Sequence, residues 1–188
     1  MRKLPFIFIS GGCRSGKSAY AEKTAKGLSP DCLYIATAEV HDEEMRERVL
    51  RHQRLRGDTW RLYESSSQEA PDLWQRLPSL IRPGEALLFD CLTLWVASCL
   101  QHPGLMKDFS SHCGKLLQSL WSLNCPVVLV SNEVGMGVVP ETSSGRIFRD
   151  VAGIAGQQAA ALATNVVLMV SGIPLAVKGE LPLFSQTA

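Results

Sequence analysis

The stretch Phe6–Ser18, FIFISGGCRSGKS, decides the fold. Its apolar start, Phe6–Ile9, predicts a buried strand, and its second half matches the pattern G-x-x-x-x-G-K-[S/T] from Gly11 to Ser18. The residues that follow predict a helix, which gives the motif the strand–turn–helix setting of a nucleoside triphosphate site. The alternative without function is a glycine-rich turn with a solvated lysine, and the flanking strand and helix argue against it.

Each part of this phosphate loop predicts a contact with a nucleotide. The loop residues are Gly11, Gly12, Cys13, Arg14, Ser15, Gly16, Lys17 and Ser18. The glycines let backbone N–H groups point at a phosphate, and the helix that begins near Lys17 directs the positive end of its dipole there. We expect Lys17 to act as the catalytic cation at the β- and γ-phosphates, and the hydroxyl of Ser18 to bind Mg²⁺.

The composition is that of an ordinary globular protein. The 188 residues are 46% hydrophobic and 20% charged, which predicts a single domain over 1–188, with a frayed tail at about 179–188. The net charge of +1 argues against a nucleic-acid surface, and no apolar run approaches the roughly 20 residues of a membrane span. The six cysteines form no C-x-x-C pair, which predicts reduced thiols in a cytoplasmic protein.

Strand and helix patterns alternate along the chain. After the first strand, apolar runs predict strands at Cys32–Thr37, Ala86–Asp90, Pro126–Ser131 and Asn165–Val170. Helical patterns occupy Ser18–Lys26, Asp42–Arg56, Gln68–Ile81, Cys91–Leu100, Lys107–Leu123 and Arg146–Ala163. The alternation predicts an α/β P-loop nucleotide-binding fold with a mostly parallel central sheet flanked by helices. Thr59–Glu64 predicts a small antiparallel or edge element, and Leu175–Lys178 a short edge strand.

The run Ala86–Asp90, ALLFD, ends in a carboxylate. In P-loop proteins an acid at a strand end holds Mg²⁺ near the phosphates, and we expect this strand to lie beside the phosphate loop. An apolar run that ends in Asp is common, so the prediction depends on its pairing with the loop. We therefore expect Asp90 to join Ser18 at the metal.

Polar residues also follow the strand Pro126–Ser131, from Asn132 to Gly137. Open α/β sheets bind ligands at the carboxyl ends of their strands, so these residues are candidates for ligand contacts. The long loop that continues through Thr142 is predicted to cover a substrate.

The helix Asp42–Arg56 carries a histidine on its apolar face. Met45, Val49 and His52 fall at positions i, i+4 and i+7, so His52 points where the apolar residues point. A histidine in this position is usually a hydrogen-bonded core residue. The alternative is an imidazole held over the nucleotide as nucleophile or acid/base, and the residues alone leave both interpretations open.

An ordered series of segments resembles one enzyme family. GGCRSGKS, YIATAEVHDEEMRERVLRHQ, LLFDCLTLW, VSNEVGMGVVPE, FRDVAG and VSGIPL occur in this order between about Phe6 and Lys178. The series resembles the bifunctional adenosylcobinamide kinase/adenosylcobinamide-phosphate guanylyltransferases of cobalamin biosynthesis. SNEVGMG and the histidine helix are far more specific to it than the phosphate loop.

The resemblance implies two reactions with GTP, ATP and Mg²⁺. The γ-phosphate of ATP or GTP first goes to the aminopropanol hydroxyl of adenosylcobinamide. GTP then donates GMP to adenosylcobinamide phosphate through a guanylylated histidine, which gives adenosylcobinamide-GDP and pyrophosphate. The family's histidine corresponds to His52, and its trimeric assembly implies a homo-oligomer here. The segments that match its GTP site contain Ala36, Thr37, Ala38, Gln53, Arg54, Leu55, Arg56, Glu64 and Asp90.

The sequence departs from the family pattern at three places. Cys13 stands where the loop usually has Ala, and Gly156 stands where we expect Asn. Thr164 and Asn165 replace an expected Asp-Glu before the last core strand. The last two departures affect the shape of the substrate side, whereas a loop position that donates through its backbone tolerates Cys13.

Two rival functions remain at this stage. A plain small-molecule kinase would use the loop without a covalent step, and it would not incorporate an α-labelled guanylyl group. A regulatory or assembly protein would bind nucleotide without turnover, although the intact Lys17, Asp90 and His52 argue against a decayed site.

Overall fold

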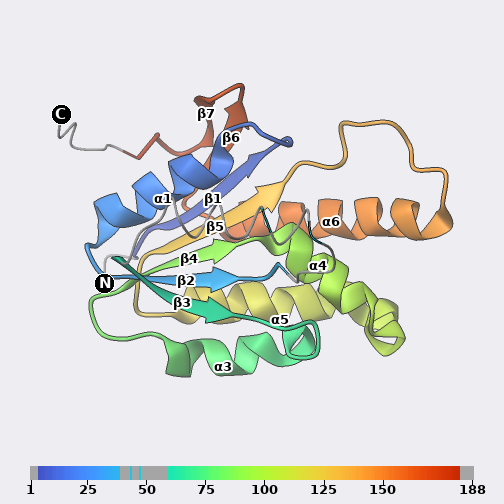
Figure 1. Ribbon diagram of the computed structural model, residues 1–188, viewed down its shortest axis with the longest axis horizontal. Coiled ribbons are helices and arrows are strands. Elements are labelled where there is room, and N and C mark those ends of the chain that lie inside the picture. The colour runs from blue at the N-terminus through green and yellow to red at the C-terminus, as the bar shows by residue number, and fades with distance from the viewer. Residues whose placement is uncertain (1–3, 39–42, 44–46, 48–58, 183–188) are drawn as a thin grey trace.

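The computed structural model describes residues 4–38, 43, 47 and 59–182. Most of the predicted helix Asp42–Arg56 lies outside these residues, and with it His52 and Gln53–Arg56. The predicted tail lies outside them from residue 183 onward. Figure 1 shows a central sheet with helices on both faces.

Seven strands form one sheet in the order β3-β2-β4-β5-β1-β6-β7. They are β1 (Phe6–Gly11), β2 (Cys32–Ala36), β3 (Trp60–Glu64), β4 (Ala86–Asp90), β5 (Val127–Asn132), β6 (Asn165–Val170) and β7 (Ile173–Lys178). All neighbouring pairs are parallel except β6 and β7, which are antiparallel. The predicted fold class, a mostly parallel sheet with a small antiparallel edge element, is confirmed.

Strand β3 confirms one of the two alternatives predicted for its segment. Thr59–Glu64 was expected to be an antiparallel or edge piece, and β3 does lie at the edge of the sheet. It nevertheless runs parallel to β2, with Cys32 opposite Trp60 and Ala36 opposite Glu64. A parallel neighbour requires a crossover connection, and the chain between β2 and β3 supplies it.

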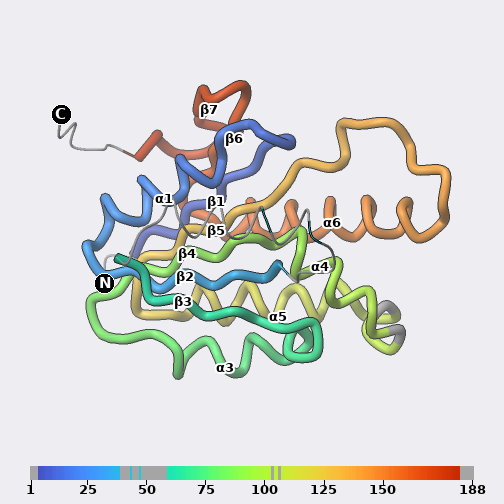
Figure 2. The backbone as a smooth tube through the Cα atoms, viewed as in Figure 1, coloured from blue at the N-terminus to red at the C-terminus, as the bar shows by residue number. Residues whose placement is uncertain are grey.

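The helices cover the two faces unequally. They are α1 (Lys17–Leu28), α3 (Leu73–Leu80), α4 (Leu92–Leu100), α5 (Phe109–Ser122) and α6 (Ser143–Leu162), with short 3-10 turns at Ala70–Asp72 and Pro103–Asp108. Helix α1 packs on one face, and α3, α4, α5 and α6 pack on the other. In Figure 2 the chain turns back from the end of β1 directly into α1. No helix in the described residues is long and apolar enough to cross a membrane.

The first strand is buried on both faces, as its continuous apolar run predicts. Phe6 and Phe8 belong to the cluster under α3, α4, α5 and α6, whereas Ile7 and Ile9 belong to the cluster under α1. Because side chains alternate along a strand, β1 joins the two halves of the core and fixes the position of the loop that follows it.

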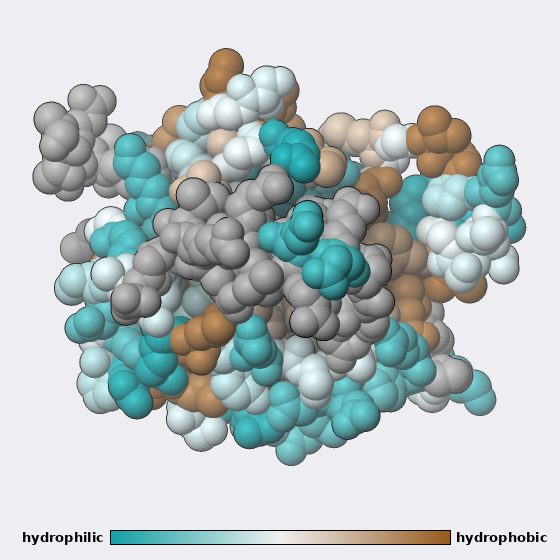
Figure 3. Space-filling model, in the orientation of Figure 1, coloured by the Kyte–Doolittle hydropathy of each residue, from teal (hydrophilic) through white to brown (hydrophobic). Residues whose placement is uncertain are grey.

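Apolar side chains are exposed at two places, the loop after β5 and the edge strand β7. Met136, Val138 and Val139 lie in the loop after β5, with exposed fractions of 80%, 94% and 58%. Ile173 and Val177 of β7 are 63% and 65% exposed. Figure 3 shows the corresponding brown surface on the loop at upper right and at the tip of β7 at the top.

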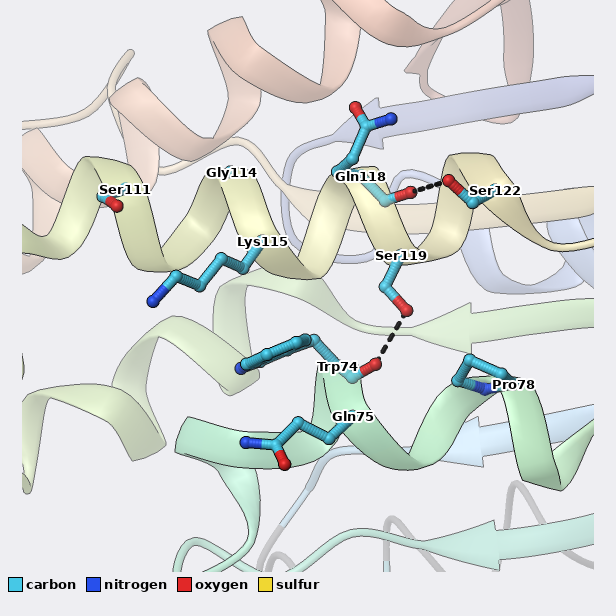
Figure 4. A pocket seen from close by; sticks show the side chains of 9 residues that line it. All are labelled: Trp74, Gln75, Pro78, Ser111, Gly114, Lys115, Gln118, Ser119 and Ser122. Carbon is cyan, nitrogen blue, oxygen red and sulfur yellow. Dashed lines mark hydrogen bonds between the residues drawn. The ribbon is translucent and has the colours of Figure 1, made fainter.

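Pro78 lies inside α3, although a proline in a helix interior commonly breaks or kinks the helix. A proline has no N–H, so the carbonyl four residues earlier, that of Trp74, loses its helical partner. The hydroxyl of Ser119 in α5 donates to that carbonyl, with an O···O distance of 2.7 Å (Figure 4). The contact between α3 and α5 therefore gives the carbonyl of Trp74 a hydrogen bond in place of the one that Pro78 cannot donate.

Candidate functional site

The phosphate loop has the backbone geometry that the motif predicts. Gly16 has a φ of 90° and directly precedes α1, and Arg14 has a φ of 55°. Left-handed backbone at the helix start favours glycine, and it turns the N–H groups of the loop inward. The N–H of Ser15 donates to the carbonyl of Gly12 across the turn at 3.3 Å.

Gly11 is required because its surroundings leave no space for a side chain. A Cβ at Gly11 would lie 2.6 Å from Oγ of Ser15 and 2.8 Å from the carbonyl oxygen of Met169. A Cβ at Gly12 would meet nothing within 4 Å. The loop is further tied to the β6–β7 turn, because the N–H of Gly172 donates to the carbonyl of Ser15 at 2.9 Å.

Lys17 is buried at the base of the loop, with 8% of its surface exposed. Its Nζ donates to the carbonyl of Gly12 at 3.1 Å. That bond uses one of the three donors of an ammonium group, and it holds the charge inside the turn where phosphates would bind. Ser18 is half-buried at the first turn of α1. Oγ of Ser15 is buried and has no hydrogen-bond partner in the described residues.

Asp90 ends β4 and is held by a tyrosine. The hydroxyl of Tyr34 donates to Oδ2 of Asp90 at 2.6 Å. The N–H of Thr37, just after β2, donates to the carbonyl of Asp90 at 3.1 Å. Thr37 Oγ1 also donates to the carbonyl of Cys91 at 2.7 Å and accepts from its N–H at 2.8 Å, across from a cis peptide bond between Asp90 and Cys91.

The position of Asp90 corrects the expectation that its strand lies beside the phosphate loop. Strand β5 lies between β4 and β1, and Val130 of β5 pairs with both Asp90 and Ile9. Strands are about 4.8 Å apart, so Asp90 lies about two strand spacings from the strand that leads into the loop.

The inserted strand β5 places polar groups between Asp90 and the loop. The hydroxyls of Thr93 and Ser131 are 3.0 Å apart, and Thr93 Oγ1 accepts from the N–H of Asn132 at 2.6 Å. The side-chain amide of Asn132 donates to Sγ of Cys91 at 3.7 Å. Sequence reasoning had selected the segment that begins at Asn132 but not Thr93 or Ser131, because their contact depends on which strand is inserted.

The remaining predicted site residues divide into three groups. Ala36, Thr37 and Ala38 lie at or just after the end of β2, next to Asp90. Glu64 is exposed at the end of β3, two strands from Asp90 at the sheet edge. His52 and the segment 53–56 lie outside the described residues.

Two cavities flank the helical layer. One of about 320 Å³ lies between the sheet and α6 and is lined by Asn132, Glu133 and Gly135 at the strand ends. The other, of about 610 Å³, lies between α3 and α5 around Trp74 (Figure 4). None of the residues predicted for the site lines the second cavity, so only the first adjoins the candidate site.

The sequence matches a known protein family. A sequence model described as "Cobinamide kinase / cobinamide phosphate guanyltransferase" matches residues 7–177. The curated relatives include the "Bifunctional adenosylcobalamin biosynthesis protein CobU" of Escherichia coli strain K12, 41% identical, with 92% of this chain and 99% of the relative covered. The protein of the same name from Salmonella typhimurium is 36% identical over the same shares. CobP of Pseudomonas aeruginosa is 39% identical, with 92% of this chain and 96% of the relative covered.

Solved structures support the fold independently. The RadB recombinase has a TM-score of 0.52 at 14% identity, covering 95% of this chain and 83% of that one. The ATPase EscN of the enteropathogenic E. coli type III secretion system has a TM-score of 0.58 at 13% identity, covering 88% of this chain and 42% of that one. At these identities the similarity concerns the fold alone.

Proposed function

Because the chain belongs to the cobinamide kinase/cobinamide phosphate guanyltransferase family, we propose that it is a bifunctional enzyme of cobalamin biosynthesis. In the first reaction it transfers the γ-phosphate of ATP or GTP to the aminopropanol hydroxyl of adenosylcobinamide. In the second it transfers GMP from GTP to adenosylcobinamide phosphate, which yields adenosylcobinamide-GDP and pyrophosphate. The single structural observation that carries the proposal is the phosphate loop with Lys17 buried inside it.

The kinase reaction depends on the residues around that loop. The N–H groups that Gly16 and Arg14 turn inward would bind the phosphates, and the ammonium of Lys17 would neutralise charge that develops on them. The carbonyl of Gly12 fixes the position of Lys17 before the nucleotide binds. Phosphoryl transfer relies mainly on such positioning and charge neutralisation.

The donors near the loop fit a magnesium ion. Mg²⁺ prefers oxygen ligands and binds through one or two protein groups together with substrate phosphates and water. Ser18 offers a half-buried hydroxyl, and Asp90 offers a half-buried carboxylate held by Tyr34. When bound with the nucleotide, the ion supplies charge neutralisation at the phosphates.

For the guanylyl transfer we propose His52 as the nucleophile, on the family resemblance. A neutral imidazole has an ordinary pKa of about 6.5, so it is mostly unprotonated at cytoplasmic pH and can attack the α-phosphorus of GTP. A protonated imidazole leaves readily, so the adduct can pass GMP to the second substrate, which is covalent catalysis in two displacements. Gln53, Arg54, Leu55, Arg56, Glu64, Thr37 and the alanines at 36 and 38 are the proposed neighbours of the GTP.

The proposal also includes an oligomeric state and a cellular compartment. The exposed apolar residues of the loop after β5 and of the edge strand β7 support a homo-oligomer, which the family resemblance makes a trimer. All six cysteines are free thiols, which supports a reducing compartment and thus the cytoplasm.

Substitution of Lys17 tests the proposal. Lys17→Ala should lower both reactions by orders of magnitude, because it removes the charge that meets the phosphates, while circular dichroism shows an unchanged fold. Lys23→Ala, on the exposed face of the same helix, is the matched control and should keep both activities. Assays with γ-labelled ATP and α-labelled GTP follow the two products separately. Near-normal phosphorylation by folded Lys17→Ala would exclude the assigned site, and phosphorylation without incorporation of the α-label by the wild type would indicate a plain kinase.

A further inference from the structure

Glu133 is a carboxylate beside the phosphate loop that the mechanism above does not use. Its backbone N–H donates to the carbonyl of Gly11, the first residue of the loop, at 2.9 Å. Three carboxylates end or directly follow parallel strands on this side of the sheet, namely Glu64, Asp90 and Glu133. In the strand order, β5 adjoins β1, β4 lies one strand further and β3 lies at the edge. Glu133 therefore follows the strand nearest to the loop.

The side chain of Glu133 is positioned by its own turn. Its Oε1 accepts from the N–H of Gly135 at 2.7 Å, and the residue is half-buried. Its second carboxylate oxygen has no hydrogen-bond partner in the described part of the chain. By contrast, Asp90 already binds the hydroxyl of Tyr34 and is the proposed metal-side acid. A carboxylate that is oriented but keeps one acceptor oxygen available suits a proton acceptor.

Space for the substrate that receives the phosphoryl group lies next to this carboxylate. The cavity of about 320 Å³ begins at Glu133 and Gly135 and extends between the sheet and α6. Gly153 and Gly156 form part of its helical wall, and a Cβ at either would meet nothing within 4 Å. Gly156 is also where the family pattern led us to expect Asn, so this chain leaves room that a longer side chain would occupy. The cavity can take a short alcohol-bearing arm, whereas a macrocycle would remain outside.

We propose that Glu133 accepts the proton of the acceptor hydroxyl in the kinase reaction and that the cavity beside it receives the arm that carries this hydroxyl. This inference rests on the proposed function and names the acceptor side of the same site. The hydroxyl oxygen forms a bond to the γ-phosphorus while the bond from that phosphorus to the β,γ-bridging oxygen breaks. The nucleoside diphosphate leaves with the electron pair, and the hydroxyl proton passes to the carboxylate of Glu133.

The two reactions of the enzyme provide an internal control for Glu133→Gln. The amide keeps the size and the bond from Gly135 but cannot take a proton. Phosphorylation of adenosylcobinamide should fall on the order of 100-fold or more in kcat, the usual contribution of a general base. The acidic limb of the kcat–pH profile, which reports protonation of the base, should disappear. GMP transfer to adenosylcobinamide phosphate, supplied directly, should stay at the wild-type rate. Asp31→Asn, which removes an exposed carboxylate just before β2 and away from the phosphate loop, should leave both reactions unchanged.

Each other result contradicts the assignment. Wild-type kinase activity in Glu133→Gln shows that another group takes the proton. An equal loss of both reactions shows that Glu133 only supports the loop. A retained acidic limb shows that the titrating base is elsewhere. If the wild type itself forms no phosphorylated product, the proposed function has failed, and that outcome is distinct from a failure of Glu133 alone.

A second variant tests the cavity without touching the carboxylate. Gly156→Leu fills the open space from the wall of α6, and leucine is a better helix former than glycine, so the fold should be retained. The KM for adenosylcobinamide should rise on the order of tenfold or more, while the KM for the nucleotide stays the same. An unchanged KM for adenosylcobinamide would show that its arm binds elsewhere.

Discussion

Cys13 differs from the other five cysteines because its side chain is exposed. Burial raises the pKa of the Cys32 thiol and raises the pKa of Cys91, Cys99, Cys113 and Cys125 to about 12. Only the thiolate reacts with alkylating agents, so brief treatment with N-ethylmaleimide should label Cys13 alone. Mg-GTP should block the reaction, because the phosphates would occupy the loop that contains this residue.

Peptide mass spectrometry with and without nucleotide measures this labelling, and Cys13→Ser provides the blank. Equal labelling of Cys13 in both samples would show that nucleotide does not cover the loop. Labelling of the buried cysteines before Cys13 would contradict the exposure on which the prediction depends.

Gly11 and Gly12 form a matched pair for a test of the loop's packing. In Gly11→Ala the new Cβ would meet the backbone carbonyl of Met169, which cannot move aside without shifting β6. The free energy of unfolding should therefore fall by about 1–3 kcal/mol, as in other overpacked sites. Gly12→Ala should change it by less than about 0.5 kcal/mol, because its Cβ meets open space. Urea denaturation without nucleotide compares them, and equal losses would contradict this packing.

Among the helices and strands, the sequence predicted which segments form each element better than it predicted which strands lie side by side. Ala86–Asp90 and Asn165–Val170 form strands with the predicted bounds, because an apolar run between turn residues specifies a buried strand locally. The helix expected at Arg146–Ala163 begins three residues earlier, at Ser143, where the hydroxyl of Thr142 accepts from the N–H of Gly145. The sequence could have predicted this N-cap, because threonine is a preferred residue at that position.

The edge strand β3 takes part in an ion pair whose contribution to the stability of the fold depends on pH. Arg61 Nε and Nη2 donate to the two carboxylate oxygens of Glu85 at 2.7 and 2.5 Å, and the Glu85 side chain is only 7% exposed. The hydrogen bond from Arg61 lowers the pKa of Glu85 below its ordinary 4.5. Its ionised form is therefore stabilised by folding, so the pair stabilises the protein above pH 4.5 and loses this effect as the pH falls through the lowered value.

Glu85→Gln should therefore reduce the free energy of unfolding by about 3 kcal/mol at pH 7, at the low end for breaking a buried pair. The difference from wild type should shrink as the pH is lowered below about 4.5. Asp150→Asn is the control, since its ion pair with Arg149 is 3.8 Å long and Asp150 is 69% exposed, and it should cost less than about 1 kcal/mol. A Glu85→Gln difference that is constant from pH 7 to pH 4 would contradict the lowered pKa.

In the molecule as a whole, the site depends on the order of the strands in the sheet, which no local sequence pattern encodes. The motif at 11–18 specified the loop because its spacing and its glycines are local requirements. The insertion of β5 between Asp90 and the loop could not be read from the sequence, because parallel strands of similar composition can pair in several orders. The contacts of Thr93 with Ser131 and of Glu133 with Gly11 follow only from that order.

If one chain carries two separable transfers, His52→Asn should abolish one of them and keep the other. Asparagine keeps polarity at this position but cannot form the guanylyl adduct, whereas the proposed γ-phosphate transfer uses Lys17, the loop and Glu133 and has no covalent histidine step. Incubation with α-labelled GTP, adenosylcobinamide and Mg²⁺ should leave wild-type protein with an acid-labile, base-stable label and produce adenosylcobinamide-GDP. The His52→Asn protein should carry no label and should stop at adenosylcobinamide phosphate, formed at close to the wild-type rate. Full conversion to adenosylcobinamide-GDP by His52→Asn, or an acid-stable label on another residue, would show that His52 is not the nucleophile.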